Sequence, residues 1–316
     1  MKILFIDTVH PYLEDQLRKK GFEISHFTST NRDEFLQIAG QFEGFIIRSK
    51  FMLDQATLDH CTHLRFIARV GAGMENIDVE YAEKKGIRCM NSPEGNRDAV
   101  GEHAMGMLLM LLNHLKKADH EVRQGVWIRA GNRGHEIMGK TVALIGYGNT
   151  GSKFARKLSG FECEILVYDK YKTDIRDPFV RQAGMEEIFE KTDILSLHVP
   201  LTPETHYLVN EDFLHRFRKN IYLLNTSRGR NLHTAHLVQA LESGKVLGAC
   251  LDVSEYESAS FENMEAASLP APMQYLLQSD KVILTPHIAG WTHESNYKMS
   301  YYLAEKIMAE FGHTIQ

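Results

Sequence analysis

The sequence predicts an α/β protein with two doubly wound parallel sheets. Short apolar runs alternate with amphipathic stretches through residues 2–95 and again through residues 141–286. This alternation is typical of parallel strands that are covered by helices on both faces. One apolar run leads straight into a Gly-x-Gly-x-x-Gly turn at residues 146–151. A chain of 316 residues is long enough to form two domains, each with its own core.

The first predicted unit is a series of strands and helices without a glycine turn of that kind. Gly21 and Gly86 follow two of its amphipathic stretches, where glycine commonly ends a helix. The expected strands are residues 2–7, 22–27, 44–48, 66–70 and 87–90. The expected helices are residues 11–20, 33–39, 54–60 and 79–85.

A long helix is expected over residues 98–118, and it is apolar on nearly every side between Ala104 and Leu112. Such a helix must be covered all round, so we expect it to be buried between domains and to form a subunit interface. Residues 125–139 are polar and rich in Arg and Gly, and we expect a loop there. Trp127 in this loop is a candidate anchor against a partner.

The second predicted unit surrounds the glycine turn. Residues 257–278 lack a clear strand and exceed the usual length of a strand–helix connection, so we expect a partly helical surface excursion. The helix expected at 295–311 cannot continue this sheet and should return to the first unit. The expected strands are residues 142–145, 165–168, 193–199, 221–225, 246–252 and 282–285, and the further helices are residues 185–191, 210–217 and 234–243.

The context of the glycine turn favours a dinucleotide site. An apolar strand precedes it, an amphipathic helix follows it, and the next apolar strand ends at Asp169. Gly146 permits the turn, Gly148 lets a pyrophosphate approach the backbone, and Gly151 allows the helix to pack closely on the strand. The N–H groups that begin the helix also favour phosphate. A tight turn that binds nothing is the alternative, and it does not account for the acid.

Asp169 favours NAD as the cofactor. Its carboxylate can accept hydrogen bonds from a ribose diol and would repel the 2′-phosphate of NADP. Lys170 and Lys172 supply nearby cations that could tolerate such a phosphate. Ordinary solvated surface charges are the simpler interpretation of these two lysines.

Composition and charge exclude several other classes. A net charge of −5 and a pI of about 6.3 argue against nucleic-acid and anionic-membrane partners. The chain has no signal-peptide pattern, and its longest apolar run, residues 104–112, is too short to span a bilayer. We therefore expect a cytoplasmic protein whose four cysteines are reduced. His233 and His236 lack a third ligand at suitable spacing, so no metal site is predicted.

Ionisable residues follow three apolar strands of the second unit, at the edge where a doubly wound sheet binds its ligands. His287 can move the proton of a hydroxyl or keto oxygen. Glu257 is the preferred carboxylate to fix the tautomer of that imidazole, and Glu255 is the alternative. Arg228 can bind a substrate carboxylate through its planar guanidinium, with a structural salt bridge as the alternative. These groups match hydride transfer between a nicotinamide and a carbon that carries oxygen.

Several motifs occur together with that glycine turn. They are Ser-Arg-Gly at 227–229, Asp-Val-x-x-x-Glu at 252–257 and Pro-His-Ile-Ala-Gly at 286–290, with further segments at 70–78, 91–96, 100–103 and 198–203. In this order and spacing they resemble the D-isomer-specific 2-hydroxyacid dehydrogenases over nearly the whole chain. The resemblance implies a Rossmann NAD-binding domain, residues 98–287, inserted into a flavodoxin-like substrate domain made of residues 1–97 and 288–316. It also implies a homodimer formed through the cofactor domain.

The resemblance assigns roles to individual residues. It implies that Arg228, Glu257 and His287 are the catalytic trio, with His287 as acid and base. The implied cofactor-binding residues are Gly146, Gly148, Asn149, Thr150, Gly151, Asp169, His198, Pro200, Thr226, Ser227, Asp252 and Gly290. The implied substrate-binding residues are Arg48, Ser49, Lys50, Gly71, Ala72, Gly73 and Asn96.

Within the family, the basic stretch Arg48-Ser49-Lys50 resembles that of enzymes acting on 3-phosphoglycerate. This implies oxidation of 3-phosphoglycerate, or reduction of its keto form, in serine biosynthesis. The alternatives are a reductase of glyoxylate, hydroxypyruvate or another small 2-keto acid, and an NAD-sensing binding protein of the corepressor type. Ser254 and Ser258 replace the Phe and Pro usual in the family. The chain ends without a regulatory domain, so no serine feedback through one is expected.

Overall fold

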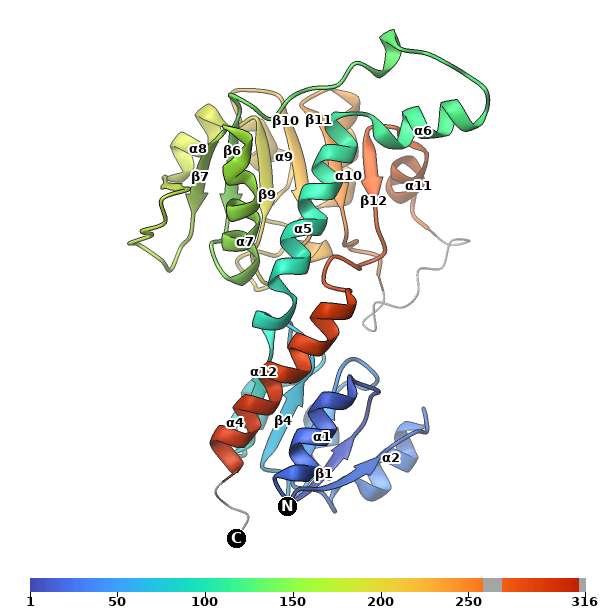
Figure 1. The fold of residues 1–316 in the computed structure, drawn as a ribbon, viewed down its shortest axis with the longest axis vertical. Helices are drawn as coiled ribbons and strands as arrows, with labels where there is room; N and C mark the ends of the chain where they lie inside the picture. The colour runs from blue at the N-terminus through green and yellow to red at the C-terminus, as the bar shows by residue number, and fades with distance from the viewer. Residues whose placement is uncertain (258–268, 313–316) are drawn as a thin grey trace. The chain divides into compact units, whose positions relative to one another are not determined.

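The computed structural model describes residues 1–257 and 269–312, and they form two compact units (Figure 1). Unit 1 consists of residues 1–97 and the chain from residue 291, and unit 2 consists of residues 98–290. Unit 2 is thus inserted into unit 1, which confirms the predicted fold class. The second boundary follows residue 290 rather than residue 287, because the N–H groups of Ile288 and Ala289 are bonded to Asp252 of unit 2.

Unit 1 contains a five-stranded sheet in the order β2-β1-β3-β4-β5, which is the flavodoxin-like order. All neighbouring strands are parallel. The middle strand β3 is completely buried, as expected for a strand with helices on both faces. The strands are β1 (Lys2–Phe5), β2 (Glu23–His26), β3 (Gly44–Ile47), β4 (Phe66–Arg69) and β5 (Arg88–Asn91).

Two apolar clusters cover the faces of this sheet. The last helix contributes Met299, Leu303 and Ile307 to the cluster that contains Ile3 and Phe66, so its apolar side accounts for its return to unit 1. The helices are α1 (Pro11–Lys19), α2 (Arg32–Ala39), α3 (Gln55–Asp59), α4 (Val79–Lys84), the first residues of α5 (Pro93–Leu112) and α12 (His293–Phe311).

Unit 2 contains a seven-stranded sheet in the order β12-β11-β10-β9-β6-β7-β8. Its first six strands in the chain follow the Rossmann order, which reverses between β6 and β9. The sequence missed β8, because this strand has two polar residues and is defined by its pairing with β7. The strands are β6 (Thr141–Ile145), β7 (Glu164–Tyr168), β8 (Arg181–Gln182), β9 (Ile194–Leu197), β10 (Ile221–Asn225), β11 (Val246–Leu251) and β12 (Val282–Leu284).

The helices of unit 2 pack on both faces of its sheet. Phe154 of α7 lies in the cluster on one face, and Leu237 of α10 lies in the cluster on the other. The helices are the remainder of α5, α6 (Leu115–Arg123), α7 (Asn149–Leu158), α8 (Met185–Lys191), α9 (Glu211–His215), α10 (Thr234–Glu242) and α11 (Ala271–Gln278).

The prediction of a single helix over residues 98–118 is wrong in its length. The prediction that this helix is covered on every side is also wrong for the single chain. Helix α5 ends at Leu112, and α6 starts at Leu115 after His114, whose φ of 53° breaks the helix. Ala104 and Leu108 are buried as expected. Glu102, Gly106 and Met110, spaced four residues apart, form an exposed stripe on the single chain.

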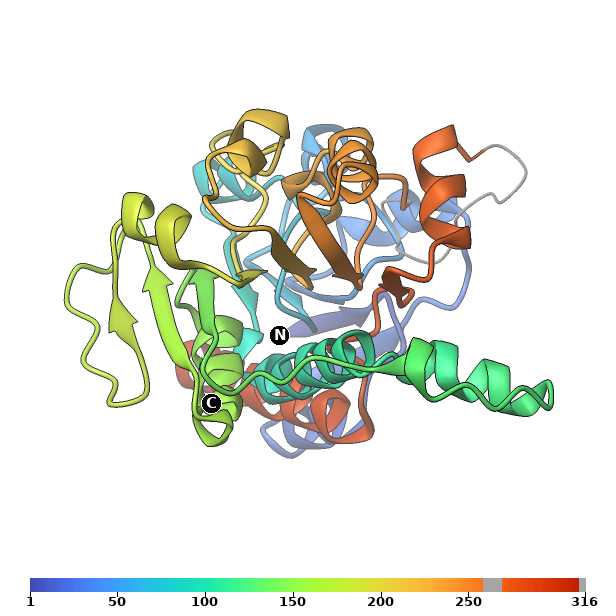
Figure 2. The ribbon, with the colours of Figure 1, turned by 90° about the horizontal axis from the view of Figure 1, so that it is seen from above.

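Helix α6 and the segment after it extend away from the body of unit 2 (Figures 1 and 2). No residue of α6 is buried. Several large apolar side chains of this arm are exposed: Leu115, Val122, Val126, Trp127, Ile128 and Met138. The arm therefore presents apolar surface that the described residues of the chain do not cover.

The excursion predicted for residues 257–278 is helical where it is described, since α11 covers Ala271–Gln278. The rest of that prediction, residues 258–268, lies outside the described residues. In the described ranges, the helices lack either the length or the apolar character needed to cross a membrane.

Candidate active site

The glycine turn between β6 and α7 is closely packed at two of its three glycines. A Cβ on Gly146, whose φ is 94°, would lie 2.3 Å from the backbone oxygen of His198. A Cβ on Gly151 would lie 2.3 Å from the backbone oxygen of Gly146. A Cβ on Gly148, by contrast, would meet nothing within 4 Å. Packing therefore requires Gly146 and Gly151, whereas Gly148 leaves space next to the N-terminus of α7.

Asp169 at the end of β7 is tied to the same turn. Its Oδ2 accepts the N–H of Tyr147, and its Oδ1 accepts the N–H groups of Tyr171 and Lys172. Partial burial alone would raise the pKa of Asp169, but these three hydrogen bonds outweigh it and lower the pKa below its ordinary value. The site thus carries a fixed negative charge at neutral pH.

The two lysines after Asp169 have partners within unit 2. Lys170 Nζ lies 2.6 Å from Oε1 of Glu204, and Lys172 Nζ donates to the backbone oxygen of Tyr147 at 2.7 Å. Both ammonium groups are therefore directed at neighbouring protein oxygens.

His198 and Pro200 lie at the end of β9. Burial lowers the pKa of His198 to about 3, so its ring is neutral. Its Nε2 lies 2.9 Å from Oγ of Ser196, and its ring packs against Phe154. This side chain thus supports the sheet beneath the glycine turn. Pro200 is exposed, and its carbonyl accepts a hydrogen bond from Thr205.

The loop after β10 holds Arg228 through Asn225, which is completely buried. The Nδ2 of Asn225 donates to the backbone oxygen of Arg228, and its Oδ1 accepts from both N and Oγ of Ser227. A Cβ on Gly229 would lie 2.0 Å from the backbone oxygen of Ser254. The Arg228 loop therefore touches the segment that carries Glu257.

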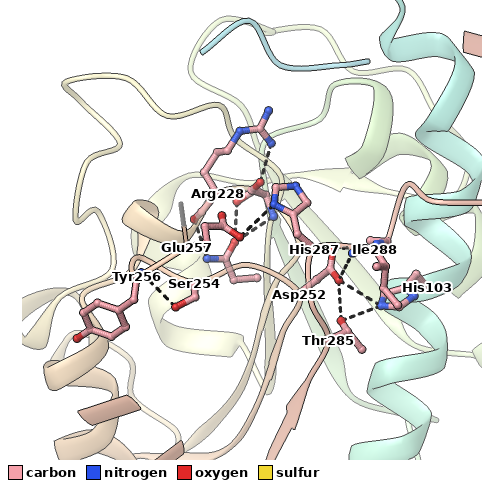
Figure 3. A network of polar contacts seen from close by, with 12 residues as sticks. His103, Arg228, Asp252, Ser254, Tyr256, Glu257, Thr285, His287 and Ile288 are labelled. Atoms are coloured by element: carbon pink, nitrogen blue, oxygen red, sulfur yellow. Dashed lines mark hydrogen bonds and ion pairs between the residues drawn. The ribbon is translucent and has the colours of Figure 1, made fainter. Parts of the chain in front are cut away.

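Glu257 and His287 form a pair in which Nδ1 of His287 lies 3.1 Å from Oε2 of Glu257 (Figure 3). A carboxylate only accepts hydrogen bonds, so Nδ1 carries the proton of this pair. Glu255 faces elsewhere, since its Oε2 accepts the N–H of Thr234 at 3.3 Å. Of the two acids considered from the sequence, the structure brings Glu257 to the imidazole.

Asp252, at 1% exposure, organises the turn that carries His287. Its Oδ1 accepts the N–H of Ile288 at 2.8 Å and the hydroxyl of Thr285 at 2.6 Å, and its Oδ2 accepts the N–H of Ala289 at 2.9 Å. Its backbone oxygen accepts the N–H of His287. These bonds bracket His287, whose φ of 55° is unfavourable for a residue with a side chain.

In unit 1, the basic stretch after β3 is anchored on Asp7. The backbone N–H groups of Arg48, Ser49 and Lys50 all donate to its Oδ2, at 2.6, 3.2 and 3.3 Å. Lys50 Nζ donates to the backbone oxygen of Phe27 at 3.1 Å. The guanidinium of Arg48 lies 4.3 Å from the ring centre of Trp291. The ammonium of Lys50 is thus held by its own unit.

The loop with Gly71, Ala72 and Gly73 follows β4 and is also fixed. The backbone oxygen of Gly71 accepts the N–H of Ser92, and that of Ala72 accepts Nδ2 of Asn91 at 2.6 Å. A Cβ on Gly71 would lie 2.1 Å from Nη1 of Arg69, so this guanidinium lies against the loop. Arg69 Nε is held by the backbone oxygen of Arg48 at 3.1 Å.

Arg69 is a candidate that the sequence reasoning missed. It is the last residue of β4 and stands two residues before Gly71. The signal was present, because the rule that selected Arg228, an ionisable residue at the carboxyl end of an apolar strand, also selects Arg69.

Two predicted contact residues have buried oxygens without hydrogen-bond partners in the described chain, Oδ1 of Asn96 in unit 1 and Oγ1 of Thr226 in unit 2. Such atoms are rare in protein interiors and call for an explanation such as a ligand or water. The described residues contain no group of three or more His, Cys, Asp or Glu side chains that could hold a metal ion.

The family model for the D-isomer specific 2-hydroxyacid dehydrogenase NAD binding domain matches residues 105–289. The chain belongs to this family. It is 33% identical over 281 residues to hydroxypyruvate reductase of Thermotoga maritima, covering 89% of each chain. It is 31% identical to D-3-phosphoglycerate dehydrogenase of Archaeoglobus fulgidus, covering 98% of this chain and 57% of that enzyme. The protein is thus an oxidoreductase that uses a nicotinamide dinucleotide and acts on a D-2-hydroxy acid or its keto form.

A solved structure supports the same conclusion for this dehydrogenase. D-lactate dehydrogenase of Aquifex aeolicus, solved with NAD and lactic acid, has a TM-score of 0.82 and 26% identity, over 99% of this chain and 96% of that one. The site described above also fits a dinucleotide. The open space at Gly148 leaves room for a phosphate. Oγ1 of Thr226, which has no hydrogen-bond partner among the described residues, supplies a hydroxyl group, and the anionic Asp169 can accept hydrogen bonds from a ribose.

The dehydrogenase should respond differently to alanine at Gly151 and at Gly148 of the glycine turn. Gly151→Ala places Cβ against backbone, so it should destabilise the protein by about 1–3 kcal/mol. In Gly148→Ala the new Cβ points into open space, so the variant should unfold at the same temperature as the parent chain. It should bind NADH more weakly, because the methyl group occupies space that the pyrophosphate needs. Thermal unfolding and NADH fluorescence titration measure the two effects. Unchanged NADH binding in Gly148→Ala would contradict the placement of the pyrophosphate.

Proposed function

We propose that this dehydrogenase interconverts 3-phosphoglycerate and 3-phosphohydroxypyruvate. The observation that carries the proposal is Arg69, whose guanidinium lies against the Gly71 loop. The backbone N–H groups of that loop would hold the substrate carboxylate, and Arg69 would bind the phosphate through a charge-assisted pair of hydrogen bonds. The similarity to a phosphoglycerate dehydrogenase over 98% of the chain supports the same substrate.

Hydroxypyruvate is the second candidate substrate. The ammonium of Lys50, which the sequence assigned to a phosphate, is bonded to Phe27 of its own unit. The match to a hydroxypyruvate reductase also covers 89% of both chains. The two candidates share their carbon skeleton, so they differ in whether a phosphate on C3 is recognised.

The proposed mechanism uses the trio of unit 2. Hydride transfer at C2 of the substrate is the chemistry that a nicotinamide dinucleotide, held by the glycine turn and Asp169, would supply. His287, held on Glu257 through Nδ1, would exchange a proton with the C2 oxygen through Nε2. Glu257 would stabilise the charged imidazolium that exists before the proton is transferred to a keto acid. Arg228 would hold the carboxylate and polarise the neighbouring carbonyl.

We further propose that NAD is preferred over NADP. The fixed charge of Asp169 would repel a 2′-phosphate, and Lys170 and Lys172 are directed at Glu204 and Tyr147 rather than at a cofactor.

The exposed apolar arm around Trp127 supports a homodimer in which a second copy covers it. The free thiols of all four cysteines support a cytoplasmic location.

Substrate choice is tested with Arg69→Gln. Its kcat/KM for 3-phosphohydroxypyruvate should fall about 10- to 100-fold, since a charge-assisted hydrogen bond contributes roughly 1.5–3 kcal/mol, whereas hydroxypyruvate should be affected little. NADH oxidation measures both. Lys50→Ala should affect the two acids equally, because its ammonium is bonded within the unit.

The matched control for Arg69→Gln is Arg65→Gln, an arginine just before β4 that lies over Phe311. It should leave both acids unaffected. His287→Ala should abolish turnover of both acids while NADH still binds. Equal losses for the two acids in Arg69→Gln would refute the assignment of the phosphate to Arg69.

Cofactor choice is tested with Asp169→Ser. Removing the anion should raise the ratio of NADPH to NADH efficiency about tenfold or more, because one charge repulsion and its hydrogen bonds to the ribose are lost. Steady-state kinetics with both cofactors measure this ratio. Asp174→Ser, which removes an acid paired with Arg176 on the surface, is the control. An unchanged ratio in Asp169→Ser would remove Asp169 from cofactor selection.

The dimer is tested with Trp127→Glu. Trp127 is 79% exposed in the single chain, and a buried unpaired carboxylate at an interface would be strongly unfavourable. The variant should elute as a monomer in size-exclusion chromatography with light scattering, while the parent chain elutes as a dimer. Leu277→Glu, at 51% exposure on α11, should remain dimeric. A monomeric parent chain would refute this proposal.

A further inference from the structure

His103 of α5 reaches the turn that carries the catalytic imidazole (Figure 3). Its Nε2 lies 3.0 Å from Oγ1 of Thr285 and 3.6 Å from Oδ1 of Asp252. Its side chain is 22% exposed, while that of Asp252 is 1% exposed. All three residues belong to unit 2, and none of the functions assigned above uses His103.

The chemistry of these groups fixes the direction of the hydrogen bonds. A threonine hydroxyl has a single hydrogen, and a carboxylate offers acceptors only. The contact of 2.6 Å between Thr285 Oγ1 and Asp252 Oδ1 is therefore a donation from the hydroxyl to the carboxylate. Met107 Sδ, at 3.7 Å from Thr285 Oγ1, is a much weaker acceptor for the same hydrogen. Oγ1 then accepts from His103, which must carry a proton on Nε2.

These bonds form a chain from α5 to the catalytic residue. His103 donates to Thr285, Thr285 donates to Asp252, and the carboxylate of Asp252 receives the N–H groups of Ile288 and Ala289. Those two residues directly follow His287. The chain therefore acts on the backbone that sets the direction of the imidazole.

A buried carboxylate needs this number of donors. Taking a charge out of water is costly unless hydrogen bonds replace its hydration. Without the hydrogen bond from His103, the hydrogen bond from Thr285 to Asp252 would be weaker. The left-handed backbone conformation of His287 would then be held less firmly. The apolar anchoring of α5 does not depend on His103, because Ala104, Leu108 and Leu111 are buried in the adjacent core cluster.

We propose that His103 is a positioning residue for proton transfer, acting through Thr285 and Asp252 on the turn of His287. This inference rests on the proposed role of His287 as acid and base, and it does not depend on which 2-keto acid is the substrate. His103 itself contacts neither of the reacting groups described above, so its effect should appear in the chemical step rather than in binding.

The test compares His103→Phe with His103→Gln. Phe keeps a ring but removes the N–H, whereas the Nε2 amide of Gln can reach the same hydroxyl. We expect His103→Phe to lower kcat and the single-turnover rate of NADH oxidation about 10- to 100-fold, as misplacement of a catalytic group does. The KM for the keto acid and the Kd for NADH should change little, and His103→Gln should restore most of the rate. Equal losses in the two variants would overturn the proposal, as would an unchanged rate in His103→Phe.

A second pair of variants keeps the proposal testable if His103→Phe folds poorly. Thr285→Val removes the hydroxyl at nearly constant shape, and Thr285→Ser retains it. We expect Thr285→Val to reduce kcat and Thr285→Ser to retain it. The double variant of Thr285→Val with His103→Phe should lose no more than Thr285→Val alone. Additive losses would show that the two residues act separately and would overturn the proposal.

The control variant for His103 is Glu102→Gln. Glu102 precedes His103 on the same helix, and its exposed carboxylate pairs with Lys157, so turnover should remain unchanged. All variants are assayed with the 2-keto acid that the parent chain reduces fastest. A wrong substrate assignment therefore changes the reagent and not the comparison. Full turnover in His287→Ala would instead refute the proposed catalytic role, independently of the His103 variants.

Discussion

The buried carboxylate of Asp252 is the interaction on which the arrangement of unit 2 most depends. It accepts hydrogen bonds from the N–H groups of the two residues after His287 and from the hydroxyl of Thr285 before it. One side chain at the end of β11 thus fixes the segment after β12. The close approach of Gly229 to the backbone of Ser254 joins the loop after β10 to the same region. Three neighbouring strands therefore contribute Arg228, Glu257 and His287 to one edge of the sheet.

Much of this arrangement could be predicted, because periodicity and parallel topology are local properties of the sequence. Apolar runs located the strands, and the rule that parallel strands expose their carboxyl ends at one edge selected the region of Arg228 and His287. The choice of Glu257 over Glu255 needed motif spacing, since both are carboxylates on one short segment. The structure separates them by direction, with Glu255 turned to the start of α10.

Other features depend on tertiary contacts that no local pattern reveals. Strand β8 exists because β7 offers it a partner. The break at His114 is a left-handed backbone conformation that residues with a side chain seldom adopt. The sequence could not show that the ammonium of Lys50 bonds to Phe27 or that the guanidinium of Arg69 lies on Gly71. Long basic side chains reach in many directions, so their position in the sequence does not fix where their charge lies.

The bonds from residues 48–50 to Asp7 have a consequence for how this scaffold diversifies. Three successive main-chain N–H groups form a set of donors that can bind an anion, and here a carboxylate of the protein itself occupies them. An anion from outside the protein would therefore meet the side chains of residues 48–50 and not their main-chain N–H groups. Because these bonds use main-chain N–H groups, substitutions at residues 48–50 can change the charge of this loop while its backbone keeps the same anchor.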